Sequence, residues 1–130
     1  MPLKKSYFHA WFRSVHKGRL PARFAILTAY DPRGKKATPA KNRAADKRLA
    51  AELDALKIKR FRVTGGNESG SHREPGWGLL ASAITARALA VKYDQDAFFW
   101  ITAGGIYLGS AEGGRLIRAG SWETRQARWA

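Results

Sequence analysis

Residues 23–30 read RFAILTAY, and within this stretch Phe24 and Ile26 alternate with Ala25 and Leu27. The side chains of a β-strand point alternately to the two faces of a sheet, and here both alternating sets are apolar. The stretch therefore predicts a strand that is covered on both faces. It is the first strand we expect in the chain, and the other elements are placed relative to it.

The segment after this strand predicts a turn, a helix and a second strand. Asp31-Pro32-Arg33-Gly34 has turn chemistry, because proline fixes one backbone angle and glycine tolerates the left-handed region. Thr38 and Pro39 suit the N-cap and first residue of a helix that runs to Lys57, with its leucines on one side. Residues 58–64, IKRFRVT, alternate as a half-exposed strand.

The C-terminal half predicts a loop, a strand, a helix and a hairpin. These elements are a polar loop at 65–76, a strand at 77–83, a helix capped by Thr85 and ending at Tyr93, and strands at 97–102 and 106–110 joined by Ala103-Gly104-Gly105. The resulting order is β-α-β-β-α-β-β. It predicts an α+β single-domain sandwich, in which a mixed or antiparallel sheet carries two helices on a face.

The chain has 130 residues, enough for one compact domain. We divide it into an aromatic, basic N-terminal extension at 1–21, an α+β domain at 22–112 and a basic, Trp-containing tail at 113–130. The extension holds Tyr7, Phe8, Trp11 and Phe12, which either pack onto the core or form a partner-binding arm. Packing is favoured, because exposed aromatic clusters reduce solubility.

The composition excludes several classes of protein. The chain has no cysteine, which excludes a disulfide scaffold, a thiolate zinc site and a cysteine nucleophile and favours a reducing, cytoplasmic location. We find no signal peptide and no apolar run of the roughly 20 residues that a membrane span needs. No motif for a cofactor or a metal is present, so we expect none.

Several short blocks of the chain resemble a known bacterial family. They are Ile26-Leu27-Thr28-Ala29-Tyr30-Asp31-Pro32 with Gly34, Lys41-Asn42-Arg43-Ala44-Ala45, Gly65, Glu74-Pro75, and Tyr93-Asp94-Gln95-Asp96-Ala97. Over residues 24–108 the chain resembles domain-of-unknown-function family 3293, a set of small proteins. The resemblance implies a compact domain of helices and strands, and it implies no particular activity.

Positive charge is the strongest functional signal. The formal net charge is +14, and residues 1–48 hold thirteen Lys and Arg against two acids. We predict a nucleic-acid-binding surface made by Arg33, Lys35, Lys36, Lys41, Arg43, Lys47, Arg48, Lys59, Arg60 and Arg62. Such side chains contact phosphates without reading bases, which favours a non-enzymatic protein that binds DNA, RNA or a nucleoprotein assembly. A solvated basic face without a partner is the alternative.

Two further functions stay open. One is a protein–protein module or inhibitor that binds an acidic surface of a larger machine through its aromatic termini. The other is a nuclease or hydrolase that uses His72 and Glu74 of the 65–76 loop. An RNA-recognition domain is excluded, because the strand at 77–83 lacks the basic-glycine-aromatic block of that class.

Four polar residues are not required by the periodicity of any element: Asn42, His72, Glu74 and Gln95. They are the candidates for a polar pocket. A polar network that ties the 31–33 loop to the helix is the simpler interpretation, with Asn42 as the hydrogen-bonding partner of that loop.

Overall fold

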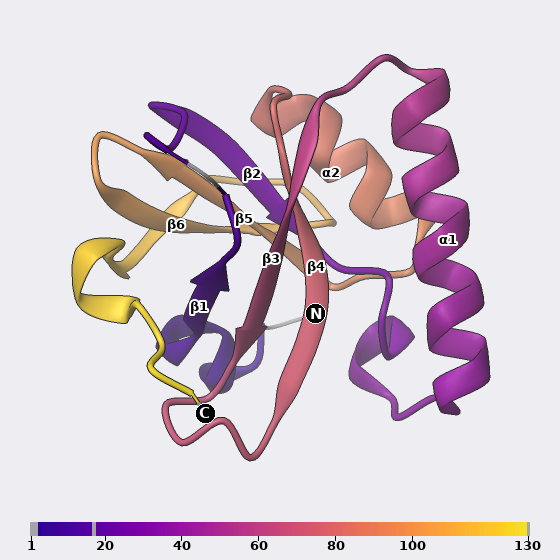
Figure 1. The fold of residues 1–130 in the computed structure, drawn as a ribbon, viewed down its shortest axis with the longest axis horizontal. Coiled ribbons are helices and arrows are strands. Elements are labelled where there is room, and N and C mark those ends of the chain that lie inside the picture. The colour runs from indigo at the N-terminus through magenta and orange to yellow at the C-terminus, as the bar shows by residue number, and fades with distance from the viewer. Residues whose placement is uncertain (1–2, 17, 130) are drawn as a thin grey trace.

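The computed structural model describes residues 3–16 and 18–129 (Figure 1). Its elements in chain order are η1 (Lys5–His9), β1 (Trp11–Ser14), β2 (Arg23–Leu27), η2 (Pro32–Gly34), α1 (Pro39–Ala55), β3 (Arg60–Gly66), β4 (Arg73–Leu79), α2 (Ala83–Lys92), β5 (Ala97–Thr102), β6 (Gly105–Ser110), β7 (Ile117–Ser121) and η3 (Glu123–Arg125). Met1, Pro2 and Lys17 of the predicted extension and Ala130 of the predicted tail lie outside the described residues. Neither α1 nor α2 is long and apolar enough to span a bilayer.

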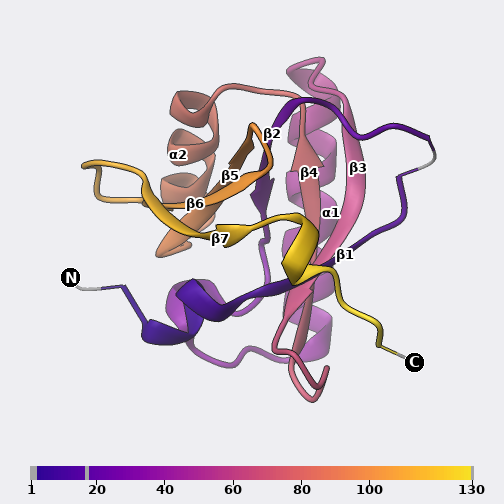
Figure 2. The same cartoon turned by 90° about the vertical axis from the view of Figure 1, so that its left-hand side faces the viewer.

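The seven described strands form one sheet in the order β1-β3-β4-β2-β5-β6-β7, and every neighbouring pair is antiparallel. The two edge strands approach each other through the C-terminal segment, because Phe12 of β1 pairs with Gln126 and accepts a 2.8 Å hydrogen bond from the Ala127 N–H. The sheet is therefore strongly curled, with β1 and β7 in front of its central strands in Figure 2.

A hydrophobic core lies on each face of β2. Ala25 and Leu27 face α1 and α2, where they pack against Leu49, Leu53 and Leu89. The other face of β2 lines the inside of the curl, where Phe24 and Ile26 pack with Phe12, Val63, Ile101 and Ile106. The α+β class, the two helices on one face and the strand covered on both faces are thus confirmed.

Helix α1 begins where its sequence predicts and ends at Ala55, two residues before the predicted end. The Thr38 Oγ1 accepts a 3.2 Å hydrogen bond from the Lys41 N–H, and Pro39 occupies the first turn. At the other end Lys57 takes a left-handed conformation (φ 57°), and the Ile58 N–H donates to the Leu53 carbonyl at 2.9 Å. This left-handed C-terminal cap turns the chain from α1 directly into β3.

The prediction of a polar loop over 65–76 was wrong. β3 continues to Gly66 and β4 begins at Arg73, so that only residues 67–72 connect them. Of the predicted strand at 77–83, only residues 77–79 are strand, as the end of β4, and residue 83 already belongs to α2. Pro75 can lie within β4 because the β2–β4 ladder ends at Leu27 and Trp77. The backbone of β2 therefore needs no hydrogen bond from an N–H at residue 75, which proline lacks.

Helix α2 also begins earlier than predicted. The Ser82 Oγ accepts a 3.1 Å hydrogen bond from the Thr85 N–H and is the N-cap, whereas Thr85 lies inside the first turn. The predicted hairpin is present as β5 and β6.

Both terminal segments contribute strands to the sheet. β1 pairs with β3, and β7 pairs with β6. The packing interpretation of the N-terminal aromatics holds for Phe12, whose buried ring stacks on Trp122 at 5.5 Å between centroids and meets Phe99 edge-on at 5.0 Å. Trp129 is also buried.

Candidate functional site

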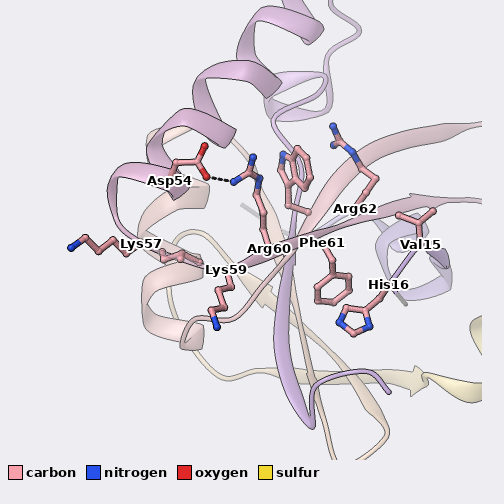
Figure 3. Close-up of a pocket in the computed structure, with 10 residues that line it drawn as sticks. Val15, His16, Asp54, Lys57, Lys59, Arg60, Phe61 and Arg62 are labelled. Atoms are coloured by element: carbon pink, nitrogen blue, oxygen red, sulfur yellow. Dashed lines mark hydrogen bonds and ion pairs between the residues drawn. The ribbon is translucent and has the colours of Figure 1, made fainter. Parts of the chain in front are cut away.

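An open groove of about 820 Å³ lies where α1 ends and β3 begins (Figure 3). It is lined by Val15, His16, Asp54, Lys57, Ile58, Lys59, Arg60, Phe61, Arg62 and Trp77. We call it the β3 groove. Lys59, which immediately precedes β3, and Phe61 point to one side of the backbone, and Arg60 and Arg62 point to the other (Figure 3). Cationic and aromatic groups thus wrap around the first residues of one strand.

Two lysines give the groove its free charge. Lys57 and Lys59 are exposed, and neither forms an ion pair within residues 3–16 and 18–129. Lys57 occupies the left-handed position that glycine favours at a helix end, which costs a non-glycine residue about 1 kcal/mol. Lys57 is therefore a charged side chain at a backbone position that glycine would occupy with less strain.

Arg62 is held rigidly by the fold. Its two terminal nitrogens donate to the Asp46 carboxylate at 3.1 and 2.9 Å, and one of them also donates to the Gly76 carbonyl at 3.1 Å. Its guanidinium carbon lies 3.6 Å from the centre of the Trp77 ring. Because Asp46 neutralises it inside the β3–α1 contact, Arg62 joins the helix to the sheet and is not a free surface cation.

Arg60 is held much less tightly. It pairs through one terminal nitrogen with Asp54, whose side chain is 66% exposed, and its guanidinium lies 4.7 Å from the Trp77 ring centre. An ion pair with an exposed carboxylate contributes only about 0–1 kcal/mol. Arg60 can therefore exchange Asp54 for another anion at little cost.

Three shielded polar atoms in the groove lining lack a hydrogen-bond partner among the described residues: Nδ1 of His16, Nε of Arg60 and Nε1 of Trp77. The arginine and indole nitrogens can only donate. A buried donor without an acceptor costs about 1–3 kcal/mol, so the groove lining is unsatisfied unless an acceptor enters. These two donors therefore need hydrogen-bond acceptors, such as oxygen atoms, from outside the described residues.

The aromatic wall of the groove is anchored to the sheet. The Phe61 ring lies over its cross-strand partner Gly78, where an added Cβ would come within 2.4 Å of the ring. It meets Phe24 edge-on at 5.1 Å on one side and the His16 ring at 4.8 Å on the other. His16 follows β1, so the N-terminal segment supplies part of the wall.

The four predicted pocket residues gather around the 30–31 backbone, on a different part of the molecule. The Asn42 Oδ1 accepts from the Asp31 N–H at 2.8 Å, and its Nδ2 donates to the Asp31 Oδ1 at 2.8 Å, as expected for a loop-to-helix network. Gln95 Nε2 donates to the Tyr30 carbonyl at 3.1 Å. Glu74 lies against Asp31, and the exposed His72 places its Nε2 3.8 Å from the Glu74 Oε1.

Asp31 and Glu74 form a carboxyl pair with opposite pKa shifts. Burial, the neighbouring Asp31 charge and their shared hydrogen bond raise the pKa of Glu74 to about 7. Burial also acts to raise the pKa of Asp31, but the hydrogen bonds from the Ala37 N–H and Asn42 outweigh it and leave that pKa lowered. Glu74 thus holds a proton near neutral pH while Asp31 stays ionised.

Comparison with known protein families gives one match. Residues 27–98, more than half of the chain, match the family described as "Protein of unknown function (DUF3293)". The chain belongs to this family. No curated protein and no solved structure matches the chain.

The family region of the chain holds both features described above. The match spans the Asp31–Asn42–Glu74 network and the part of the β3 groove from Asp54 to Trp77. Val15 and His16 lie before the matched residues. The groove is therefore built mainly from the family domain and completed by the N-terminal segment of this chain.

The ten predicted cations are spread over the whole length of α1 and both of its ends. Lys59, Arg60 and Arg62 line the groove, whereas Arg33, Lys35 and Lys36 lie at the opposite end of α1, about 25 Å away for a 17-residue helix. Arg33 is exposed and pairs with Asp94 at 3.4 Å.

The remaining four cations lie on two flanks of α1. Asp46 faces β3 and Glu52 faces α2, where it accepts hydrogen bonds from Lys92 and Tyr93 at 2.7 Å. At 100° per residue, Arg43 and Lys47 lie toward the Asp46 side, and Lys41 and Arg48 lie toward the Glu52 side.

Sequence reasoning missed Lys57, His16 and Trp77 as groove residues. Lys57 was expected to end the helix, and the left-handed cap places it in the lining of the groove, with its side chain running outward (Figure 3). His16 could not be found from sequence, since only the β1–β3 pairing brings it beside Phe61.

Proposed function

We propose that the protein binds nucleic acid without catalysing a reaction on it, and that phosphate groups occupy the β3 groove. The observation that carries the proposal is a pair of donors, Arg60 Nε and Trp77 Nε1, beside two lysines, Lys57 and Lys59; in the described part of the chain, neither the donors nor the lysines have a partner. Phosphate oxygens are strong hydrogen-bond acceptors, and their negative charge is opposite to that of Lys57 and Lys59. A DNA or RNA backbone supplies them in series.

Arg60 is the residue that would change partners on binding. Its bond to the exposed Asp54 is inexpensive to break, and once the side chain turns to expose Nε, a phosphate can accept from both a terminal nitrogen and Nε in the bidentate geometry that arginine favours. Arg62 would keep its place, since Asp46 and Gly76 hold it. The groove thus offers one exchangeable guanidinium on a fixed platform.

The rest of the molecule supports the same partner. With a formal charge of +14, the protein attracts any polyanion over long range, and this attraction weakens with salt. The cations at the far end of α1 would add to this general attraction without contacting the ligand in the groove. A cytoplasmic location, favoured by the lack of cysteine, is part of the proposal.

Charge reversal at Lys57 and Lys59 should weaken nucleic-acid binding at least about tenfold, because two phosphate contacts become repulsive. The slope of log affinity against log salt should also become shallower by about 1.5, since each phosphate contact contributes about 0.7–0.9. The measurement is fluorescence anisotropy of a labelled oligonucleotide between about 50 and 200 mM salt.

The matched control is charge reversal at Lys35 and Lys36, which removes the same total charge at the other end of α1. It should weaken binding only by the loss of long-range attraction and leave most of the salt slope intact. Equal effects of the two double variants, or no binding by the unchanged protein, would refute the proposal.

A further inference from the structure

Lys59 and the rings of Phe61 and His16 lie side by side along one face of β3 (Figure 3). Lys59 immediately precedes β3 and Phe61 lies within it, and Figure 3 shows both side chains on the same side of the backbone, where a two-residue spacing in extended chain is about 7 Å. A cation and an aromatic wall at this separation match the two ends of a nucleotide, which are the phosphate and the base.

His16 has an unused hydrogen-bonding atom at this wall. Its ring packs edge-on against Phe61, and its Nδ1 has no partner among the described residues. An imidazole nitrogen can donate to or accept from the edge of a base, depending on its tautomer. The wall therefore offers an apolar surface to one flat ring, and a polar contact follows when the imidazole turns its shielded Nδ1 toward that ring.

We propose, resting on the function proposed above, that the β3 groove takes an unpaired nucleotide and that the protein prefers single-stranded over double-stranded nucleic acid. In a duplex, each base is paired along its edge and stacked on both faces, so that only phosphates reach the groove. In a single strand, a base can leave the stack and lie against an aromatic side chain. Lys57, Lys59 and Arg60 then hold the adjoining phosphates.

The test compares a labelled single-stranded oligonucleotide with the same sequence in a duplex, at one salt concentration. We expect the single strand to bind about tenfold more tightly, the scale to which one base–aromatic contact contributes. His16→Ala should remove most of this preference by weakening single-strand binding and leaving duplex binding unchanged. His9→Ala, at an exposed histidine outside the groove, is the control and should change neither.

The outcomes separate the two proposals. Equal binding of both probes, or equal weakening of both by His16→Ala, would overturn the single-strand inference and leave the phosphate groove standing. Binding of neither probe would overturn both. Phe61→Leu provides a second arm if His16→Ala proves unfolded by circular dichroism, because it removes the ring and keeps an apolar side chain over Gly78.

Discussion

Replacing Asp46 with alanine should lower the free energy of unfolding by about 3 kcal/mol. The Asp46 side chain is only 14% exposed, and its two oxygens accept both terminal nitrogens of Arg62. Removing Asp46 leaves the Arg62 guanidinium without its carboxylate; such a loss costs about 3–5 kcal/mol when burial is complete, and the 31% exposure of the Arg62 side chain places it at the low end. Urea unfolding followed by circular dichroism measures the change.

The matched control is Asp54→Ala, which removes the carboxylate that pairs with Arg60. The Asp54 side chain is 66% exposed and accepts one hydrogen bond from Arg60, whereas Asp46 accepts two from Arg62, so we expect a smaller loss of about 1 kcal/mol. Adding Arg62→Met to Asp46→Ala should recover much of the loss, because the unpaired charge is then gone. Equal losses in the two Asp variants would contradict the division into a structural and an exchangeable arginine.

The second large effect concerns pH. The unchanged protein should lose about 2–3 kcal/mol of unfolding free energy as the pH rises from 5 to 8. The pKa of Glu74 is about 7 in the folded chain and 4.5 ordinarily. Between these values the folded state holds a proton that the unfolded state has released, and stability falls with rising pH at up to about 1.4 kcal/mol per unit.

The lowered pKa of Asp31 has the opposite sign. Its contribution is present above the ordinary value of 3.8 and is lost only at lower pH, so it does not affect this window. Lys4 lies near Glu74 and lowers its pKa, but burial and Asp31 outweigh it. Glu74 is therefore the group of this pair that titrates between pH 5 and 8.

Glu74→Gln should flatten the pH dependence and make the protein more stable than the unchanged chain at pH 8. The amide keeps the shape of the side chain and can donate to Asp31 without carrying a charge. Glu68→Gln in the exposed 67–72 connection is the control, and it should leave the slope unchanged. Thermal or urea unfolding at several pH values decides the matter, and an unaltered slope in Glu74→Gln would contradict the burial of this carboxyl.

The elements predicted from the sequence are those with a clear local pattern. Three examples are the alternation of RFAILTAY, the cap at Thr38 and the hairpin at 97–110. Each depends on residues that lie close together in the sequence. β1 and β7 were missed because they are short edge strands whose partners, β3 and β6, determine their conformation. Glu74 and Pro75 are uncommon in strands, and the sequence therefore predicted a loop where pairing with β3 forms β4.

For the candidate site, too, the sequence predicted the residues in local patterns and not the contacts between elements. Strand alternation found Lys59, Arg60 and Arg62, but the carboxylates that neutralise two of them come from α1, and no local pattern shows that pairing. The network of Asn42 with the 31–33 loop was foreseen, whereas the facing of Asp31 and Glu74 depends on where β4 meets that loop.

The central claim is that the ligand enters the β3 groove, and an NMR titration tests it most directly. The chain has five tryptophans, and among them the Trp129 indole N–H already donates to the Asn67 carbonyl at 3.0 Å, whereas that of Trp77 has no partner in the described chain. Adding a single-stranded oligonucleotide should shift the Trp77 indole signal and the amide signals of Lys57, Lys59 and Phe61, and leave the Trp129 indole in place. Shifts confined to Arg33, Lys35 and Lys36, with the Trp77 signal unmoved, would contradict the account.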